Sequence, residues 1–194
     1  MRAQRAPEEP STGGGIFGEP NVLERSDVVD RIAEICNILI QRELRAIKRE
    51  LEAYPDDASV WTTPSGISNA GGTFALHCAG NLQHFIGAHL GGSGYVRDRD
   101  AEFRRRDVPR AELYAEIDRA MNAVEKTLTG DRPASFPRIF PEQLSGRSLS
   151  TDVWLMHLVA HLAYHLGQLN YHRRLTTGLA TTVDDVSVRE LPSA

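Results

Sequence analysis

The chain has 194 residues, of which 22 are Lys or Arg and 26 are Asp or Glu, for a net charge of −4, and 41% are hydrophobic. These values are typical of a globular domain that buries its own core without disulfides. They argue against a nucleic-acid partner, because the densest basic run is only Arg104-Arg105-Arg106. We therefore expect a small-molecule partner.

Residues 1–20 are predicted to form a flexible tail, because prolines and glycines interrupt a segment with few large apolar side chains. The segment lacks the apolar stretch of a secretory signal, so we expect a cytoplasmic protein. Cys36 and Cys78 lie in apolar stretches and are expected to be buried free thiols. No membrane association is expected, since residues 153–169 are shorter than the roughly 20 apolar residues of a span and include three histidines.

Apolar side chains recur at helical spacing in four stretches of the chain. The predicted helices span residues 22–53, 74–90, 109–129 and 151–177. Thr73 and Ser150 are suited to cap the second and fourth helices, while Gly91 and Gly178 follow their ends. The pattern predicts four long helices.

The fold class predicted from these elements is all-α, a four-helix bundle over residues 21–178 with long connecting loops. One such loop, residues 55–72, carries Trp61. The only weak strand pattern is TTVDDVSV, within a C-terminal tail predicted over 179–194. Spacing alone leaves the order and direction of the helices open.

All seven histidines fall in two of the predicted helices. The second helix carries His77, His84 and His89, and the fourth carries His157, His161, His165 and His172. His161 and His165 lie one turn apart and about 40° apart around an α-helix, so both can reach one ion. Either His77 or His84 can complete a triad, whereas α-helical spacing points His89 elsewhere.

Three neutral imidazoles with open coordination positions are typical of a catalytic divalent metal site. The flanking sequence VWLMHLVAHLAYHLGQL contains no Asp, Glu, Lys or Arg, so unpartnered imidazoles there would be costly to bury. Imidazole suits several ions, and the metal can be Zn²⁺, Ni²⁺, Fe²⁺ or Mn²⁺.

Three segments, LHCAGNLQHFIGAHLGG, YVRDRDAEF and HLAYHLGQLNYHRRL, resemble the DinB/YfiT-like metalloenzyme superfamily, in its bacterial branch with the RDxEF segment. The resemblance covers residues 22–178 and implies an up-down-down-up bundle, a homodimer and one divalent ion held by His77, His161 and His165. It assigns no ligand role to His84, His157 or His172. The superfamily includes thiol-dependent S-transferases and a mycothiol-dependent isomerase.

Several polar residues flank the expected ligands. Asn81 and Gln168 can each hydrogen-bond near the site and orient an imidazole, and Tyr164 can donate to a bound substrate. The alternating charges of residues 97–103 predict an ion-pair clasp that ties this loop to the helices.

Three hypotheses follow for the function. In the first, the ion activates a low-molecular-weight thiol for transfer to an electrophile. In the second, the ion activates water in a hydrolase, with Glu102 or another loop carboxylate as base. In the third, the protein is not an enzyme, and the ion stabilises a structural or stress-related bundle.

Overall fold

The structure is a computed structural model that describes residues 25–129, 136–143, 145–183 and 186–193. In chain order, its elements are α1 (Arg25–Glu52), α2 (Asp57–Trp61), α3 (Gly71–Leu82), the π-helical η1 (Gln83–Ala88), α4 (Arg99–Arg104), α5 (Arg110–Leu128), α6 (Thr151–Thr177) and the 3-10 turn η2 (Val188–Glu190). Within the described ranges no strand is present, which confirms the all-α class. The tail predicted over residues 1–20 lies outside these ranges.

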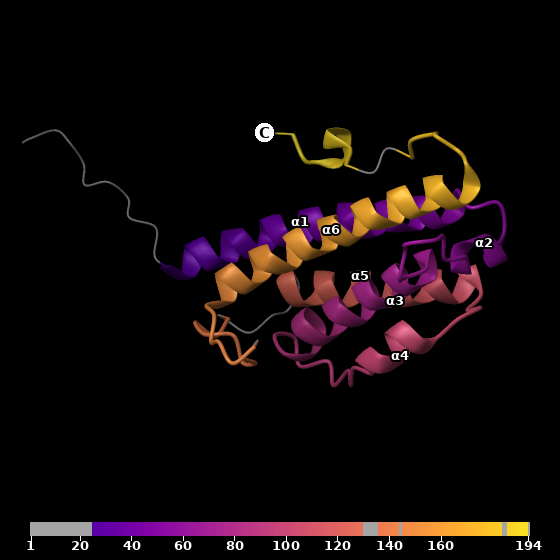
Figure 1. Ribbon diagram of the computed structural model, residues 1–194. Helices are drawn as coiled ribbons and strands as arrows, with labels where there is room; N and C mark the ends of the chain where they lie inside the picture. Colours follow the sequence, from indigo (N-terminus) through magenta and orange to yellow (C-terminus); the bar gives the residue numbers. More distant parts are fainter. Residues whose placement is uncertain (1–24, 130–135, 144, 184–185, 194) are drawn as a thin grey trace, which may run out of the picture.

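The long helical segments lie in two layers, with α1 beside α6 and α3 beside α5 (Figure 1). α1 and α6 run in the same direction, because Cys36 contacts Met156 near their starts and Glu50 pairs with Arg173 near their ends. α5 runs against α1 and in the same direction as α3. The second layer is therefore antiparallel to the first.

Contacts between α3 and α6 place His77 opposite His161 and His165. The start of α3 at Gly71 lies against Leu169, whereas Phe85 in η1 packs on Trp154 near the start of α6. α3 and α6 are thus antiparallel, and the middle of α3 faces the middle of α6. His77 lies in this middle part of α3, and His161 and His165 lie in the facing part of α6.

The ends of the two C-terminal long helices lie close to their predicted positions. α5 begins after Pro109, and α6 begins after Ser150, although the Ser150 side chain makes no capping hydrogen bond. Gly178 ends α6 with a φ of 71°, the left-handed conformation that glycine adopts without strain.

α3 begins three residues before the predicted start, so the assignment of Thr73 as its cap is wrong. The N-cap residue is Ala70, and Thr73 is buried inside the helix. Two glycines make this possible, because a Cβ on Gly72 would lie 2.3 Å from Cζ2 of Trp61 and one on Gly71 would lie 2.6 Å from Oη of Tyr54. Aromatic rings from the preceding segment therefore pack directly on the first turn of α3.

Both long connections contain a short helix that periodicity does not reveal. Asp56 caps α2 within the predicted 55–72 loop, and Asp98 caps α4 within the segment that follows η1. The indole N–H of Trp61, at the end of α2, donates to the carbonyl of Val108 at 3.0 Å. The two connections are thus joined at one end of the molecule.

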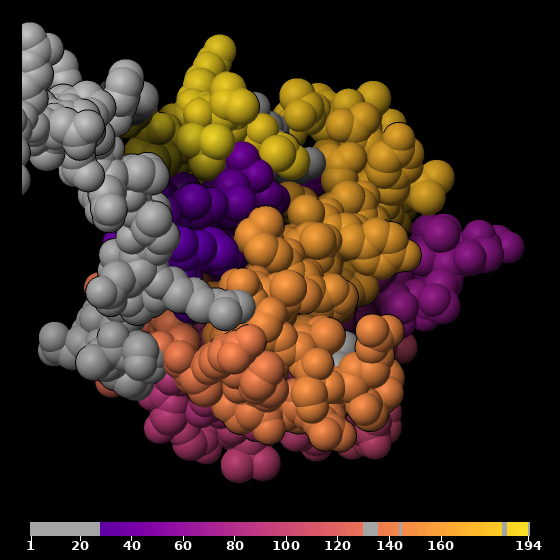
Figure 2. Space-filling model, turned by 90° about the vertical axis from the view of Figure 1, so that its left-hand side faces the viewer, coloured from indigo at the N-terminus to yellow at the C-terminus, as the bar shows by residue number. Residues whose placement is uncertain are grey.

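The described part of the predicted C-terminal tail lies against α1 and α6, seen as yellow beside indigo in Figure 2. Arg173 pairs with Glu50, both wholly buried, and also donates to the carbonyls of residues 179 and 181. Glu190 pairs with Arg45 at 2.8 Å and with Arg49 at 2.9 Å. Ion pairs and backbone hydrogen bonds therefore hold this segment in place.

No helix in the described ranges is both long enough and apolar enough to cross a membrane. The apolar stretch 153–169 lies within α6. There, Leu155, Leu158, Leu162 and Leu166 form its buried face.

Candidate metal centre

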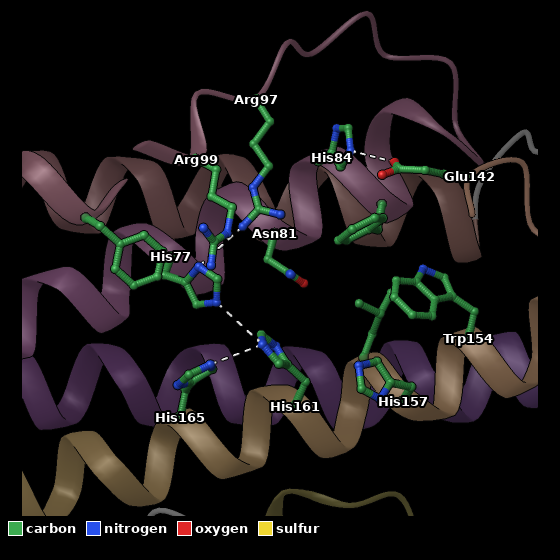
Figure 3. A pocket seen from close by; sticks show the side chains of 13 residues that line it. His77, Asn81, His84, Arg97, Arg99, Glu142, Trp154, His157, His161 and His165 are labelled. Atoms are coloured by element: carbon green, nitrogen blue, oxygen red, sulfur yellow. Dashed lines mark hydrogen bonds and ion pairs between the residues drawn. The ribbon is translucent and has the colours of Figure 1, made fainter. Parts of the chain in front are cut away.

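A cavity of about 590 Å³ lies between α3, α6 and the segment around α4 (Figure 3). It is lined by His77, Asn81, His84, Phe85, Arg97, Arg99, Phe103, Glu142, Trp154, His157, Leu158, His161 and His165. Such a volume accommodates a small molecule. Its wall joins apolar rings to imidazole and guanidinium groups, a composition suited to a polar ligand.

The structure brings together His77, His161 and His165. Their Nε2 atoms face one another, at 3.4 Å between His77 and His161 and 3.1 Å between His161 and His165 (Figure 3). One nitrogen from each residue lies within 4.8 Å of the others. The two residues on α6 are one turn apart, and the third histidine comes from the antiparallel helix across the cavity.

The outer nitrogen of His77, which is the Nδ1 atom on the side of the ring away from the other two histidines, is held by a buried carboxylate. Nδ1 of His77 lies 3.0 Å from Oε2 of Glu102, and Arg97 binds both oxygens of the same carboxylate at 2.7 and 2.8 Å. Burial raises the pKa of Glu102, but the hydrogen bonds from Arg97 and His77 outweigh burial and hold that pKa below its usual value. An ionised Glu102 therefore accepts the Nδ1 proton of His77.

The outer nitrogen of His165 is held in the same way by a neutral amide. Nδ1 of His165 lies 2.7 Å from Oε1 of Gln168, whose Nε2 donates to the hydroxyl of Tyr164 at 3.0 Å. Gln168 therefore orients the imidazole as the sequence predicted, and Tyr164, whose side chain is exposed, supports Gln168.

These outer contacts determine which nitrogen carries the proton. With Nδ1 protonated, Nε2 of His77 and Nε2 of His165 both present lone pairs to the centre. His161 can carry at most one proton on Nε2, so it can donate to only one of the lone pairs on His77 and His165. The arrangement leaves acceptor capacity that a cation would satisfy.

His161 is held in its neutral form. Burial and the neighbouring imidazoles of His165 and His77 lower the pKa of His161 to about 4. Burial also lowers the pKa of His165, against the opposing effect of Gln168. Neutral imidazoles are the form that binds a metal ion.

Three converging imidazoles, of which His77 and His165 are hydrogen-bonded through Nδ1, form a donor set suited to a divalent transition-metal ion. No family model, curated protein or solved structure matches this chain. The chemistry of the centre therefore rests on the geometry of its own residues.

In the described chain, two other cavity residues make no hydrogen bond to the triad. Asn81 is buried in the wall, but within the described chain it makes no hydrogen bond to the three imidazoles. The exposed ring of His157 stacks on Trp154, with centroids 5.0 Å apart. Asn81 thus lies beside the three imidazoles without orienting them in this structure, and its role at an occupied site stays a prediction. His157 is not one of the three converging residues.

His172 has a structural environment away from the triad. Its Nε2 donates to the carbonyl of Thr62 at 2.9 Å, and its Nδ1 lies 2.6 Å from the hydroxyl of Tyr54. These bonds join α6 to the connection between α1 and α3. Both ring nitrogens are occupied, so His172 is not a ligand.

The expectation that His89 points away from the other histidines is wrong. Its ring faces that of His84, with centroids 4.6 Å apart. The cause is the π-helical backbone of η1, which changes the angle between successive side chains.

Glu102 also differs from the base suggested for a hydrolase, because its carboxylate is occupied by Arg97 and His77. Of the predicted ion-pair clasp, Arg97 and Glu102 form a pair within the 97–103 segment, and the contact of Glu102 with His77 joins that segment to α3. Sequence reasoning missed that Glu102 also contacts His77. The available signal was the RDxEF segment itself, which combines a buried acid with a nearby arginine.

Proposed function

We propose that His77, His161 and His165 hold one divalent metal ion in an enzyme of the DinB/YfiT-like type, and that the enzyme transfers a small thiol to an electrophile. The observation that carries the proposal is the convergence of three Nε2 atoms, with His77 and His165 fixed from outside by Glu102 and Gln168. When bound, the ion would supply a Lewis acid that lowers the pKa of a thiol from about 8.5.

The directions of the four long segments support the family resemblance. α1 and α6 run one way and α3 and α5 the other (Figure 1), which is the up-down-down-up order that the resemblance implies. The ligands also come from the second and fourth of these segments, as expected. The proposed bundle topology rests on both points.

The charges around the cavity favour the thiol over water as the nucleophile. Glu102 is occupied by its two partners, and Glu142, the carboxylate among the lining residues, contacts His84. Among the described lining residues no free carboxylate is therefore at hand to activate water, whereas a thiol ionises more readily and needs less assistance.

The cysteines of the chain are unsuited to act as the nucleophile. Burial raises the pKa of Cys36 to about 11 and raises that of Cys78 further. A substrate thiol would therefore supply the sulfur. Its S–H proton would pass to solvent, its sulfur would form a bond to an electrophilic carbon, and the leaving group would depart with its electron pair.

Arg99 is positioned to recognise an anionic group on the substrate. Its side chain lines the cavity and stacks over the ring of Phe103, with the guanidinium carbon 4.9 Å from the ring centroid. Arg97 is already engaged by Glu102, so Arg99 is the cavity arginine left for a carboxylate. Thiols that carry a carboxylate are the expected substrates.

The test is conjugation of glutathione to 1-chloro-2,4-dinitrobenzene by Zn²⁺-loaded protein. The loaded protein should give a rate above background that is lost on removing the ion and on changing His161 to Ala, with helix content unchanged. Metal-dependent ester hydrolysis without conjugation would instead favour the hydrolase. Absence of both activities, with ion loss lowering only the melting temperature, would favour the structural bundle.

We also propose a homodimer formed through α6. This helix carries exposed apolar side chains at helical spacing, namely Val153, Met156, Tyr164, Tyr171 and Leu175, each at least 50% exposed. Exposed apolar side chains that recur along one face of a long helix are typical of a surface that another chain covers. Sedimentation should give twice the 21.5 kDa chain mass, and a monomer at micromolar concentration would contradict it.

A further inference from the structure

A second cluster of metal-ligating side chains lies toward the other end of the same cavity. It consists of His84, His89 and Glu142, each of which offers one ligand atom within 4.8 Å of the others. Oε2 of Glu142 lies 2.9 Å from Nε2 of His84 and 2.7 Å from Nε2 of His89. The triad is separate, because His77 and His84 are two turns, or about 10 Å, apart along their helix.

The π-helical backbone of η1 creates this cluster. In an α-helix, residues five apart differ by about 140° around the axis, which would point His84 and His89 to different faces. Here the amide of His89 bonds to the carbonyl of His84 at 3.1 Å, five residues earlier. The wider turn places the two side chains one above the other. Such single π turns are found frequently at functional sites.

Hydrogen bonds inside the cluster do not satisfy its polar atoms. Nε2 of His89 is buried and has no hydrogen-bond partner in the described chain, although it lies 2.7 Å from the carboxylate oxygen. Nδ1 of His84 is likewise buried without a partner. Two imidazoles therefore approach one carboxylate oxygen in a geometry that only partly suits hydrogen bonding.

The surroundings make this arrangement costly without a ligand. The ring of Phe140 lies 5.6 Å from that of His89, and Phe85 lies 4.7 Å from that of His84. Apolar rings thus limit the water that can reach the unpartnered nitrogens. Two imidazoles and one carboxylate are a ligand set used for Zn²⁺ and for Fe²⁺.

We propose that His84, His89 and Glu142 form a second divalent metal site, distinct from the triad. Donor atoms bonded at about 2.0–2.2 Å around one ion lie at most about 4.4 Å apart, so small side-chain shifts suffice to close the site. A bound ion would join η1 to the 136–143 segment and fix the wall of the cavity at that end. The two proposed sites share no residue, so the second can be tested independently of the triad.

The experiment counts Zn²⁺ bound per chain after equilibration at a fixed free Zn²⁺ concentration and removal of excess metal. The wild type should retain two ions per chain. His89→Ala and Glu142→Gln should each lose one ion, His161→Ala should lose the other, and the double variant His89→Ala/His161→Ala should retain none. His157→Ala is the matched control, because it removes a cavity histidine outside both clusters and should keep two ions.

Different outcomes separate the two sites. One ion in the wild type, lost only in His161→Ala, would overturn the second site and leave the triad intact. One ion lost only in His89→Ala and Glu142→Gln would overturn the triad instead. Glu142→Gln keeps the size of the side chain, so it tests the second site even if His89→Ala fails to fold, with helix content by circular dichroism as the check.

Discussion

The helix that spans residues 71–88 presents histidines in two different ways. In its first part, α-helical α3 places His77 opposite α6, and Glu102 holds the outer nitrogen of that imidazole. In its second part, π-helical η1 brings His84 and His89 together, and Nδ1 of His84 has no hydrogen-bond partner among the described residues. The same residue type thus occurs in an oriented and in a less constrained setting.

The difference shows that histidine spacing alone does not predict which imidazoles converge. The hydrogen-bond register of the backbone and the contacts of the outer nitrogens are needed as well. A fixed imidazole presents its lone pair without further loss of side-chain freedom. We therefore expect the triad to bind its ion more tightly than the second cluster. The substitutions below test this contrast.

The largest effect is expected from removing the charge that holds His77. Glu102→Gln should weaken Zn²⁺ binding at the triad about 10- to 100-fold, because outer partners of this kind orient and polarise the ligand. Titration calorimetry against a competing chelator measures the change. Asp100→Asn, on the same helix α4 but exposed, is the control, and equal affinities for both variants would contradict the assigned role of Glu102.

The next effect concerns the glycine that lets α3 start against Trp61. Gly72→Ala should lower the free energy of unfolding by about 1–3 kcal/mol, because the new methyl group overlaps the indole ring. The same change in a Trp61→Phe background should cost less, since the smaller ring leaves space. Urea denaturation of the wild type, the two single variants and the double variant forms a double-mutant cycle. Additive changes in the free energy of unfolding would show that the two residues do not interact.

A smaller loss is expected at the neutral partner of the triad. Gln168→Ala should weaken Zn²⁺ binding about 2- to 10-fold, because a hydrogen bond between neutral groups contributes less than one to a carboxylate. Tyr164→Phe removes only the support behind Gln168 and should change affinity less. A loss at Gln168 larger than that at Glu102 would reverse the proposed order of the two contacts.

The remaining prediction concerns the pH dependence of stability. The folded-state pKa of His161 is about 4, below the unfolded value of about 6.5, so the unfolded chain binds more protons between these values. The contribution of neutral His161 to the stability of the metal-free protein should be fully present above pH 6.5. It should be lost progressively as the pH drops toward 4. In His161→Gln the fall should be shallower. The same dependence of the unfolding free energy on pH in both proteins, measured by urea denaturation, would contradict a half-buried, neutral His161.

Periodicity was sufficient for the long helices and for the pair on α6. Their apolar stripes and end residues follow local rules, and residues one turn apart on an α-helix must share a face. His77 could be joined to that pair only through the family resemblance, because spacing alone also allowed His84. The structure places His77, and not His84, beside His161.

The features that sequence reasoning missed depend on tertiary contacts. The start of α3 is set by Trp61 and Tyr54 packing on glycines, a contact that no local pattern contains. The π turn of η1 changes one hydrogen-bond register without an evident sequence signal. Glu102 reaches His77 only because α4 folds back along α3 (Figure 1).

The most direct test of the proposed centre is the location of the ion itself. Anomalous diffraction from crystals of Zn²⁺-loaded protein should show a peak about 2.0–2.1 Å from Nε2 of His77, His161 and His165. That result would place the ion on the three converging nitrogens. Fully loaded crystals with no anomalous peak between these three atoms would contradict the account.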